Sequence, residues 1–366
     1  MTIYFVMLSY FAVLFAILKL NMEKVQKDIK KLYSLLCFVI LFLIMGLRAP
    51  TVGADIGQYL YKYNNLTPNI NSFISELDIV SFLGNENGFT FLNSILKTLH
   101  FNNQQYIMFF SFIFAFSFIF FYYKYSKNIF ISILLFITIG NFAMSMTGLR
   151  QTLAIVLTLY SFKFIFERKL IKFLVIILMA MSFHFSSIIF LPVYFLYGII
   201  LKKRDAILVF CVVLLFLPLN KIIYNYFFIP FIPQQYTIYM NFSASLNPLV
   251  VLVALSINFF PIFFWDNFNS KNDSEKKLVS FLFIGSSLYS IFNILALNLV
   301  WINRLSFYFM PFNELLIPLV LYYIKSKETK QILTTAIIML VILHFVISTP
   351  GGTLKIDDYL FFNQVK

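Results

Sequence analysis

The sequence predicts an all-α, polytopic integral membrane protein with about twelve transmembrane helices. Hydrophobic residues make up 61% of its 366 residues, charged residues make up only 12%, and phenylalanine alone occurs 49 times. A soluble domain typically carries about 25% charged residues, so this chain lacks the polar side chains to cover itself in water. Apolar stretches close to the roughly 20 residues that span a bilayer also recur from one end of the chain to the other.

Apolar segments account for most of the chain, which predicts one membrane domain over residues 1–366. The predicted helices cover residues 2–19, 33–47, 104–123, 129–147, 151–166, 171–186, 187–201, 206–219, 248–265, 279–300, 306–324 and 332–348. The first segment lacks a basic start and an A-x-A cleavage site, so we expect a retained helix rather than a signal peptide. His184 and Pro192 interrupt the apolar run between 171 and 201, which is therefore interpreted as two helices.

The net charge of +13 is explained by membrane topology, without nucleic acid as a partner. Most lysines fall in alternate connections between the predicted helices, and the positive-inside rule assigns such connections to the cytoplasm. With twelve helices, this assignment predicts that both termini are extracytoplasmic. The basic residues concerned are Lys19, Lys24, Lys27, Lys30, Lys31, Lys124, Lys127, Arg168, Lys169, Lys172, Lys202, Lys203, Arg204, Lys271, Lys276, Lys277, Lys325, Lys327 and Lys330.

Two long segments, 48–103 and 220–247, are predicted on the opposite, extracytoplasmic face. Within the first, the stretch GFTFLNSILKTLH (88–100) has apolar residues at helical spacing, which predicts an amphipathic helix on the membrane surface. The second segment is rich in tyrosine, phenylalanine and proline. Its rings suit either stacking on sugar faces or anchoring at the membrane interface, and the sequence leaves both interpretations open.

Three arginines on that same face are candidates for binding a substrate. The chain uses 23 lysines and five arginines, yet Arg48, Arg150 and Arg304 each lie at the end of an apolar run. A guanidinium suits bidentate binding of phosphate or carboxylate, and its charge is not lost by burial. The three residues therefore predict a cradle for a diphosphate at the membrane surface. The alternative is that each arginine pairs with a nearby acid or caps a helix end.

Few residues on this face could accept a proton from a sugar hydroxyl. Asp55 lies in a glycine-containing turn, Glu86 precedes the predicted amphipathic helix, and His184 lies near the outer end of an apolar segment. The sequence does not rank these three candidates. Neither His100 nor His344 has an acid or a second histidine at ligand spacing, and no P-loop or H-E-x-x-H motif is present, so we expect no metal and no cofactor.

Four stretches, taken in order, resemble the EpsG family. GLRAPTVGADIGQYLYKY (46–63) resembles its arginine, Val-Gly-x-Asp and spaced-tyrosine signature. NENGFTFLNSILKTL (85–99) resembles its Glu-Pro-Gly-aromatic segment, with Asn87 in place of the usual proline. The stretch 146–195 is similar to the block in which Arg-Gln opens a helix, a basic turn follows, and the next helix reaches a Phe-His. NRLSFYFMPFNELLIP (303–318) resembles the late arginine and proline segment.

This resemblance implies a GT-C-like fold and a Wzy-like polymerase of bacterial exopolysaccharide, capsule or O-antigen. Such a glycosyltransferase would act, without a metal, at the outer face of the cytoplasmic (inner) membrane on oligosaccharide repeat units linked to undecaprenyl diphosphate. Membrane lipids, a chain-length regulator and a flippase are the other implied partners. The resemblance carries over Arg48, Tyr59, Arg150, Gln151 and Arg304 as substrate or diphosphate ligands, and Asp55, Glu86 and His184 as catalytic candidates.

Two other functions remain open at the level of the sequence. An O-antigen ligase-type glycosyltransferase would use similar cations with a different acceptor. A flippase or transporter of lipid-linked glycans would need polar residues near the middle of its helices, for which Asn141, Asn258 and Asn293 are the candidates. The ionisable groups instead gather at one predicted face, which favours the polymerase.

Overall fold

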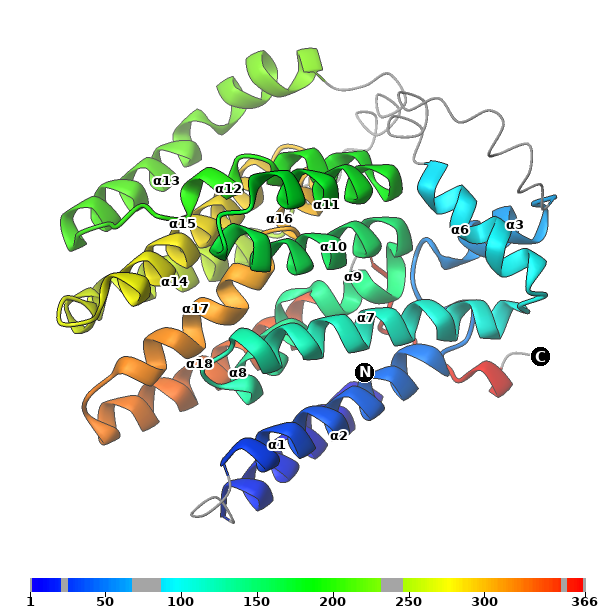
Figure 1. Cartoon of the computed structure of the whole chain (residues 1–366), viewed down its shortest axis with the longest axis horizontal. Coiled ribbons are helices and arrows are strands. Elements are labelled where there is room, and N and C mark those ends of the chain that lie inside the picture. Colours follow the sequence, from blue (N-terminus) through cyan, green and yellow to red (C-terminus); the bar gives the residue numbers. More distant parts are fainter. Residues whose placement is uncertain (1, 21–25, 68–86, 232–245, 350–353, 365–366) are drawn as a thin grey trace. The chain divides into compact units, whose positions relative to one another are not determined.

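The computed structural model describes residues 2–20, 26–67, 87–231, 246–349 and 354–364 (Figure 1). Within these residues all regular structure is helical, apart from one isolated antiparallel bridge between Arg48 and Phe361. The chain divides into two compact units, which are described separately below. Unit 1 comprises Met1–Leu191 with Thr349–Lys366, and unit 2 comprises Pro192–Ser348. The all-α prediction is confirmed, and the single membrane domain remains a prediction.

Six helices in the described part of the chain are long and apolar enough to cross a membrane, and the number is eight if each of two bent helix pairs is counted as one span. The six are α2 (Gln26–Gly46), α7 (Asn103–Tyr125), α10 (Leu149–Phe166), α13 (Lys203–Ile223), α15 (Asp273–Leu295) and α18 (Lys327–Ser348). By the length and composition of these helices, the chain is a multi-pass membrane protein. Twelve spans and the GT-C-like fold remain predictions.

The predicted helix over 129–147 is broken near its middle, and a second bend lies near the start of the helix predicted over 306–324. Residues 129–147 form α8 (Ile129–Ile139) and α9 (Asn141–Thr147), which are bent by 55°. The break falls at Gly140, whose φ of 132° is a conformation that side chains disfavour. A second bend of 55° separates residues 300–306 from α17 (Met310–Tyr323). Such breaks are tolerated in membrane proteins where protein surrounds them, and every residue of α9 is buried.

The prediction of a transmembrane helix over 187–201 is wrong. In its place the structure has the 3-10 helix η1 (Phe185–Phe190), which follows the end of α11 (Leu170–Phe183), and the short helix α12 (Val193–Leu196). Pro192 has no backbone N–H to continue a helix. Gly198 then adopts a φ of 112°, which helical residues do not adopt. These two residues limit α12 to a single turn.

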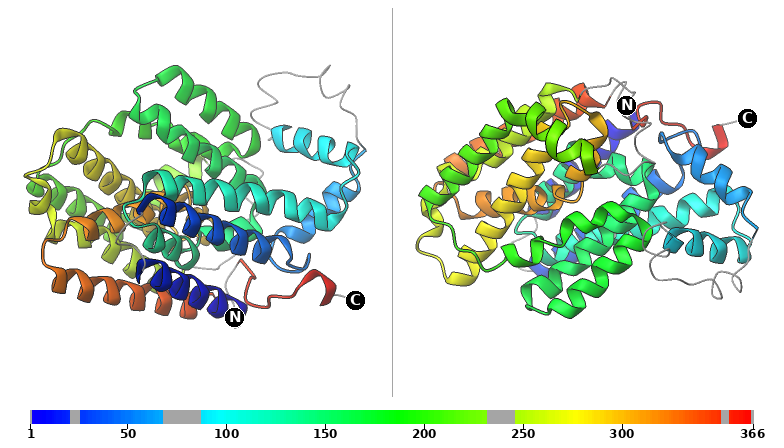
Figure 2. Two further views of the ribbon diagram at one scale, coloured as in Figure 1. Left: turned by 60° about the horizontal axis from the view of Figure 1, so that its bottom comes forward. Right: turned by 90° about the horizontal axis from the view of Figure 1, so that it is seen from above.

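Unit 1 packs its long helices side by side (Figures 1 and 2). α2 lies along α7, and α10 lies along α11. Aromatic rings fill the interior, for example Phe118 and Phe136, whose ring centroids are 4.5 Å apart. α1 (Thr2–Leu20) lies beside α2 and α8. The short helices α3 (Ile56–Asn64) and α6 (Asn87–Thr98) lie at one end of this unit (Figure 1).

The lysine-rich connections of unit 1 lie at its other end. Lys30, near the start of α2, donates a hydrogen bond of 3.3 Å to the backbone oxygen of Ser126, just after α7. At the turn between α10 and α11, Lys169 pairs with Glu167 at 2.7 Å, and Glu167 also lies within electrostatic reach of Lys124. The alternation of basic loops in the sequence predicts this grouping. The side of the membrane that this end faces remains a prediction.

The helix predicted over 88–100 forms as α6. It buries Phe89 and Leu96, together with two polar residues, against the rest of unit 1. The Phe89 ring lies 5.8 Å from the ring of Phe110 in α7, measured between centroids. Leu99, beyond the end of the helix, is 60% exposed. The helical prediction is confirmed, while the position of α6 on a membrane surface remains a prediction.

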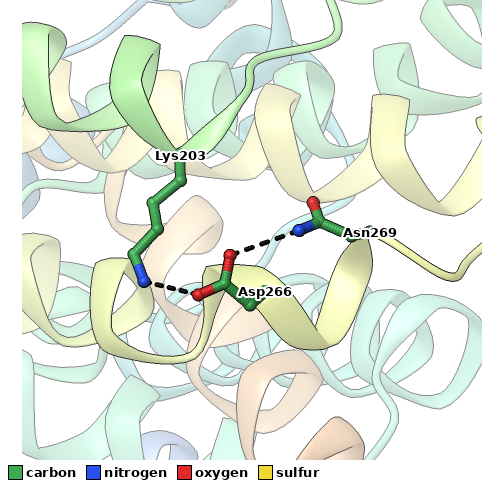
Figure 3. Close-up of polar contacts among 3 residues, drawn as sticks. All are labelled: Lys203, Asp266 and Asn269. Carbon is green, nitrogen blue, oxygen red and sulfur yellow. Dashed lines mark hydrogen bonds and ion pairs between the residues drawn. The ribbon is translucent and has the colours of Figure 1, made fainter.

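Unit 2 is organised around α15, which contacts α13, α14 (Pro248–Phe263) and α17. At its surface, Lys203 forms an ion pair of 2.5 Å with Asp266, which also accepts a hydrogen bond from Asn269 (Figure 3). The hydrogen bond from Lys203 lowers the pKa of Asp266, so this carboxylate stays ionised at neutral pH. Because the pair is well exposed, it positions the turn rather than stabilising the unit appreciably.

The aromatic-rich segment predicted over 220–247 is described only in part. α13 continues into the π-helix η2 (Tyr224–Phe228) and the 3-10 helix η3 (Ile229–Phe231). Residues 232–245, which include Tyr236 and Tyr239, lie outside the described residues. The roles that the sequence leaves open for this segment therefore remain predictions.

Candidate functional site

One end of unit 1 brings together residues from three motifs that lie far apart in the sequence. The guanidinium of Arg150, in the first turn of α10, lies 5.8 Å from the centre of the Tyr59 ring in α3. The Tyr59 ring in turn lies 5.5 Å from the ring of Phe89 in α6. α6 also packs on α11, which ends at His184. Helices α3, α6, α10 and α11 thus define a candidate site at this end.

Arg150 is half-buried and is the cationic centre of this site. It occupies the second position of α10, an 18-residue helix whose amino end carries a partial positive charge and backbone N–H groups. Its contact with the face of Tyr59 is a cation–π interaction, which holds the guanidinium in a defined orientation. Gln151, the next residue, is buried within α10. A fixed cation beside a helix amino terminus is an arrangement suited to binding a phosphate group.

Asp55 and Tyr59 present a carboxylate and a ring from the same face of α3. They are four residues apart, which places their side chains on neighbouring turns. Asp55 is half-buried and occupies the N-cap position of α3, although its side chain does not cap the helix. Because Tyr59 lies against Arg150, the α3 face that carries Asp55 is turned toward the same region. The structure therefore brings Tyr59 and Arg150 together, and Asp55 lies at the start of the same helix as Tyr59.

The amino end of α6 packs very closely on the carboxyl end of α11. A Cβ atom added to Gly88 would lie 2.4 Å from the side-chain oxygen of Ser182 and 2.9 Å from its Cβ. Only glycine permits this approach, which brings the start of α6 next to the segment that holds His184. Asn87, which stands where the family resemblance expects proline, is the first residue of α6. Glu86, immediately before it, lies outside the described residues.

Substitution of Gly88 by alanine is expected to push α6 away from α11. We expect a loss of about 1–3 kcal/mol in unfolding free energy, because overpacking of this size typically costs that much. The measurement is the thermal unfolding of the purified protein in detergent. Gly57→Ala is the matched control, because nothing lies within 4 Å of a Cβ atom added there. Equal stability of the two variants would contradict the close packing.

His184 is held at the junction between α11 and η1. Its Nδ1 accepts a hydrogen bond of 3.3 Å from the backbone N–H of Ser186 and lies 2.8 Å from the Ser186 hydroxyl. When Nδ1 accepts, a neutral imidazole carries its proton on Nε2. In this tautomer, assigned from the hydrogen bonds, His184 offers an N–H donor rather than a second basic nitrogen.

Arg48 is completely buried. Its guanidinium donates hydrogen bonds to the backbone oxygen of Met45, to the Ser111 hydroxyl at 3.1 Å and to the backbone oxygen of Met146 at 3.1 Å. Burial lowers the pKa of Arg48 to about 10, with Tyr359 and Tyr4 acting in the opposite direction, so the group is protonated at neutral pH. These bonds tie together the ends of α2 and α9 and the side of α7.

The contacts of Arg48 correspond to the helix-end role that the sequence left open for each arginine. Met146 lies four residues before Arg150, so the bond to its carbonyl helps to define where α10 begins. Arg48 thus contributes to the position of Arg150 from inside the protein. Its direct binding to a diphosphate remains a prediction.

Arg304 belongs to unit 2, where it is half-buried in the short helix α16 (Asn303–Ser306). Asn303 donates a hydrogen bond of 2.7 Å to the side-chain oxygen of Asn293 in α15. Ser306 closes the turn by donating to the backbone oxygen of Asn303 at 2.7 Å. These bonds fix the turn that carries Arg304. A cradle that combines all three arginines remains a prediction.

The structure also reveals buried polar residues that the sequence did not single out as functional. Glu314 in α17 is fully buried, and it lies within electrostatic reach of Tyr289 in α15. Asn313, beside it, is fully buried and has no hydrogen-bond partner for its side-chain oxygen or nitrogen among the described residues. The sequence contains one signal for Glu314, which is the only acidic residue inside the apolar run 306–324. Ionisable groups in membrane helices are costly, so such a residue marks a candidate functional position.

Two of the three asparagines considered for a transport pathway are bonded to the protein itself. Asn258 donates to the hydroxyls of Ser286 and Ser287 at 3.2 and 3.1 Å. Asn293 donates to the backbone oxygen of Tyr289 at 2.8 Å. Asn258 therefore links α14 to α15, while the side-chain oxygen of Asn293 accepts the hydrogen bond from Asn303 that links α15 to α16. Asn141, the third, is buried at the start of α9.

Comparison with known proteins identifies the family. A family model described as "EpsG family" matches residues 31–356, nearly the whole chain. No curated protein and no solved structure matches this chain. The matched range contains every motif described above, from the turn after α2 to the segment that carries Arg304. The chain therefore belongs to the EpsG family, a family of Wzy-like polysaccharide polymerases.

Proposed function

We propose that this protein joins polyprenyl-diphosphate-linked oligosaccharide repeat units into a polysaccharide at the outer face of the bacterial cytoplasmic membrane. Membership of the EpsG family supports a polymerase-type role in polysaccharide biosynthesis. The observation that carries the proposal is the oriented guanidinium of Arg150 at the amino end of α10, against Tyr59. This site lies at the end of unit 1 opposite its lysine-rich connections, as expected for an extracytoplasmic site.

In the proposed reaction, the growing chain on one lipid is the donor and a hydroxyl of a new repeat unit is the acceptor. The acceptor oxygen bonds to the anomeric carbon of the donor while the bond from that carbon to the diphosphate oxygen breaks. The electron pair leaves with the polyprenyl diphosphate, so negative charge develops on that group. Preorganised cations and N–H donors stabilise such charge in the transition state. In unit 1, Arg150 and the first turn of α10 supply them.

Asp55 is the proposed base for the acceptor hydroxyl. Its position four residues before Tyr59 puts it on the same face of α3 as the ring that contacts Arg150, which supports this role. The proton of the acceptor hydroxyl passes to this carboxylate as the new glycosidic bond forms. His184, whose Nδ1 is already an acceptor, is better suited to donating a hydrogen bond to a sugar oxygen. Glu86 is retained as the alternative base.

The test is reconstitution of the purified protein into liposomes that contain undecaprenyl-diphosphate-linked repeat units. The expected result is a ladder of lipid-linked polymers, formed equally well with EDTA present. Transfer of single units to a different acceptor, with no ladder, would instead identify a ligase. Movement of the substrate across the bilayer without any new glycosidic bond would identify a flippase. Asp55→Asn, compared with Glu86→Gln, then distinguishes the two carboxylates by which of them abolishes the ladder.

A further inference from the structure

The C-terminal tail, residues 354–364, is bound along the segment 47–54 that leads from α2 to the candidate site. Four backbone hydrogen bonds join the two stretches, although they lie at opposite ends of the sequence. They run from Ala49 N to Leu360 O at 2.8 Å, from Phe362 N to Leu47 O at 3.0 Å, from Gly53 N to Lys355 O at 2.9 Å and from Ala54 N to Leu354 O at 3.0 Å. Both stretches belong to unit 1, so this contact lies within one compact body.

Side chains anchor the same tail at three further points. The Tyr359 hydroxyl donates to the backbone oxygen of Ile44 at 2.7 Å, near the end of α2. The Tyr4 hydroxyl of α1 donates to the backbone oxygen of Ile356 at 2.6 Å. A third anchor lies at the last residue of α9, where Thr147 donates to the backbone oxygen of Leu354 at 2.9 Å. The views in Figures 1 and 2 accordingly show the tail beside the start of α1.

The segment 47–54 is held from both sides. A Cβ atom added to Gly53 would lie 2.3 Å from the backbone oxygen of Met146, and the φ of Gly53 is 105°. The segment therefore packs directly on Met146 at the end of α9, three residues before the start of α10. Backbone oxygens of the tail accept hydrogen bonds from three N–H groups of the segment. Buried N–H groups left without acceptors are costly. Without the tail, the segment would have to move to find other partners.

We infer that the C-terminal tail is a strap that positions the candidate site, with Tyr359 and the backbone of Phe362 as its positioning groups. Asp55 follows the strapped segment directly, and Tyr59 follows one turn later, so the strap determines where α3 meets Arg150. The hydrogen bond from Thr147 to Leu354 also ties the tail to the end of α9, next to the start of α10. The matched family range ends at residue 356, so these two strap residues lie beyond what the family model covers.

Whether the tail holds the segment 47–54 does not depend on the proposed function, whereas the effect of the tail on polymer formation rests on that function. The experiment therefore uses two readouts in a variant whose Cys37 and Cys211 are replaced by serine. Val52→Cys, 1% exposed in the strapped segment, reports opening through its rate of labelling by a membrane-impermeant maleimide. Thr51→Cys, exposed in the same segment, is the control that should label rapidly throughout. The second readout is the KM and kcat of polymer formation in liposomes.

The matched pair of strap variants is Phe362→Pro and Phe362→Ala. Proline removes the N–H that bonds to Leu47 yet suits the first position of a 3-10 turn, whereas alanine keeps the N–H and trims a side chain that is 47% exposed. Loss of one hydrogen bond should raise the labelling rate at position 52 about two- to tenfold in the proline variant only. A chain ending at residue 353 should show a larger rise and a raised KM for the lipid-linked unit.

Three outcomes separate the possibilities. Raised labelling with a raised KM supports the strap. Unchanged labelling in both the proline variant and the shortened chain overturns it, even if the full chain makes polymer. If the full chain makes no polymer, the proposed function fails, while the labelling result still decides whether the tail holds the segment. Restoration of slow labelling by adding a peptide of residues 349–366 to the shortened chain shows that a loss was due to the tail rather than to misfolding.

Discussion

Replacing Arg150 by alanine is expected to lower polymer formation at least about 100-fold, because removal of one preorganised donor to a developing anion typically costs that much. Arg150→Lys should recover little of this activity. An ammonium is a point charge that cannot form a bidentate fork to a phosphate or lie flat against the Tyr59 ring. The measurement is kcat/KM for polymer formation by purified protein in liposomes that contain the lipid-linked repeat unit.

Controls for this prediction come from other positions in the same chain. Arg204, whose side chain is 86% exposed at the start of α13, should be replaceable by alanine without loss of polymer. Tyr59→Phe keeps the ring face that Arg150 contacts and should retain most of the activity, whereas Tyr59→Ala should not. Full-length polymer from both Arg150 variants, at normal levels of protein in the membrane, would end the proposed role of this residue.

Arg48→Ala is expected to destabilise unit 1 by about 3–5 kcal/mol, chiefly through the structure rather than the substrate. Its guanidinium is completely buried and bonds to two backbone carbonyls and to Ser111. Alanine would leave these acceptors without a donor and would open a cavity in a packed interior. Lysine should also be destabilising, since one ammonium cannot reach acceptors on three helices. Thermal and denaturant unfolding of the detergent-solubilised protein measures the loss.

The same variant distinguishes the two roles that the sequence left open for Arg48. A strong loss of stability, with remaining folded protein that still binds the lipid-linked substrate, indicates a structural residue. A fully stable variant that no longer binds substrate would instead indicate a diphosphate ligand. Arg204→Ala is again the reference, because substitution of an exposed side chain usually changes stability by no more than about 0.5 kcal/mol.

Several elements of the fold could be predicted because they depend on local sequence. α7 and α15 are long apolar runs, and α6 shows helical spacing of its apolar residues, so hydropathy and periodicity suffice for them. The failure at 187–201 has a local cause too, because Pro192 and Gly198 stop a run whose hydropathy alone suggests a span. Glu314 is not apparent from hydropathy, since one acidic residue hardly changes the average hydropathy of an apolar window.

The sequence by itself determined that this protein is a helical membrane protein of the EpsG type and that Arg48, Arg150 and Arg304 lie at the ends of apolar runs, because composition, charge distribution and ordered motifs are properties of the chain alone. Only the tertiary structure decided that Arg150 faces Tyr59 while Arg48 is enclosed by backbone carbonyls. It also decided that the C-terminal tail holds the segment before α3. These outcomes depend on contacts between residues distant in the sequence, and whether a cation is presented or buried is set by such neighbours.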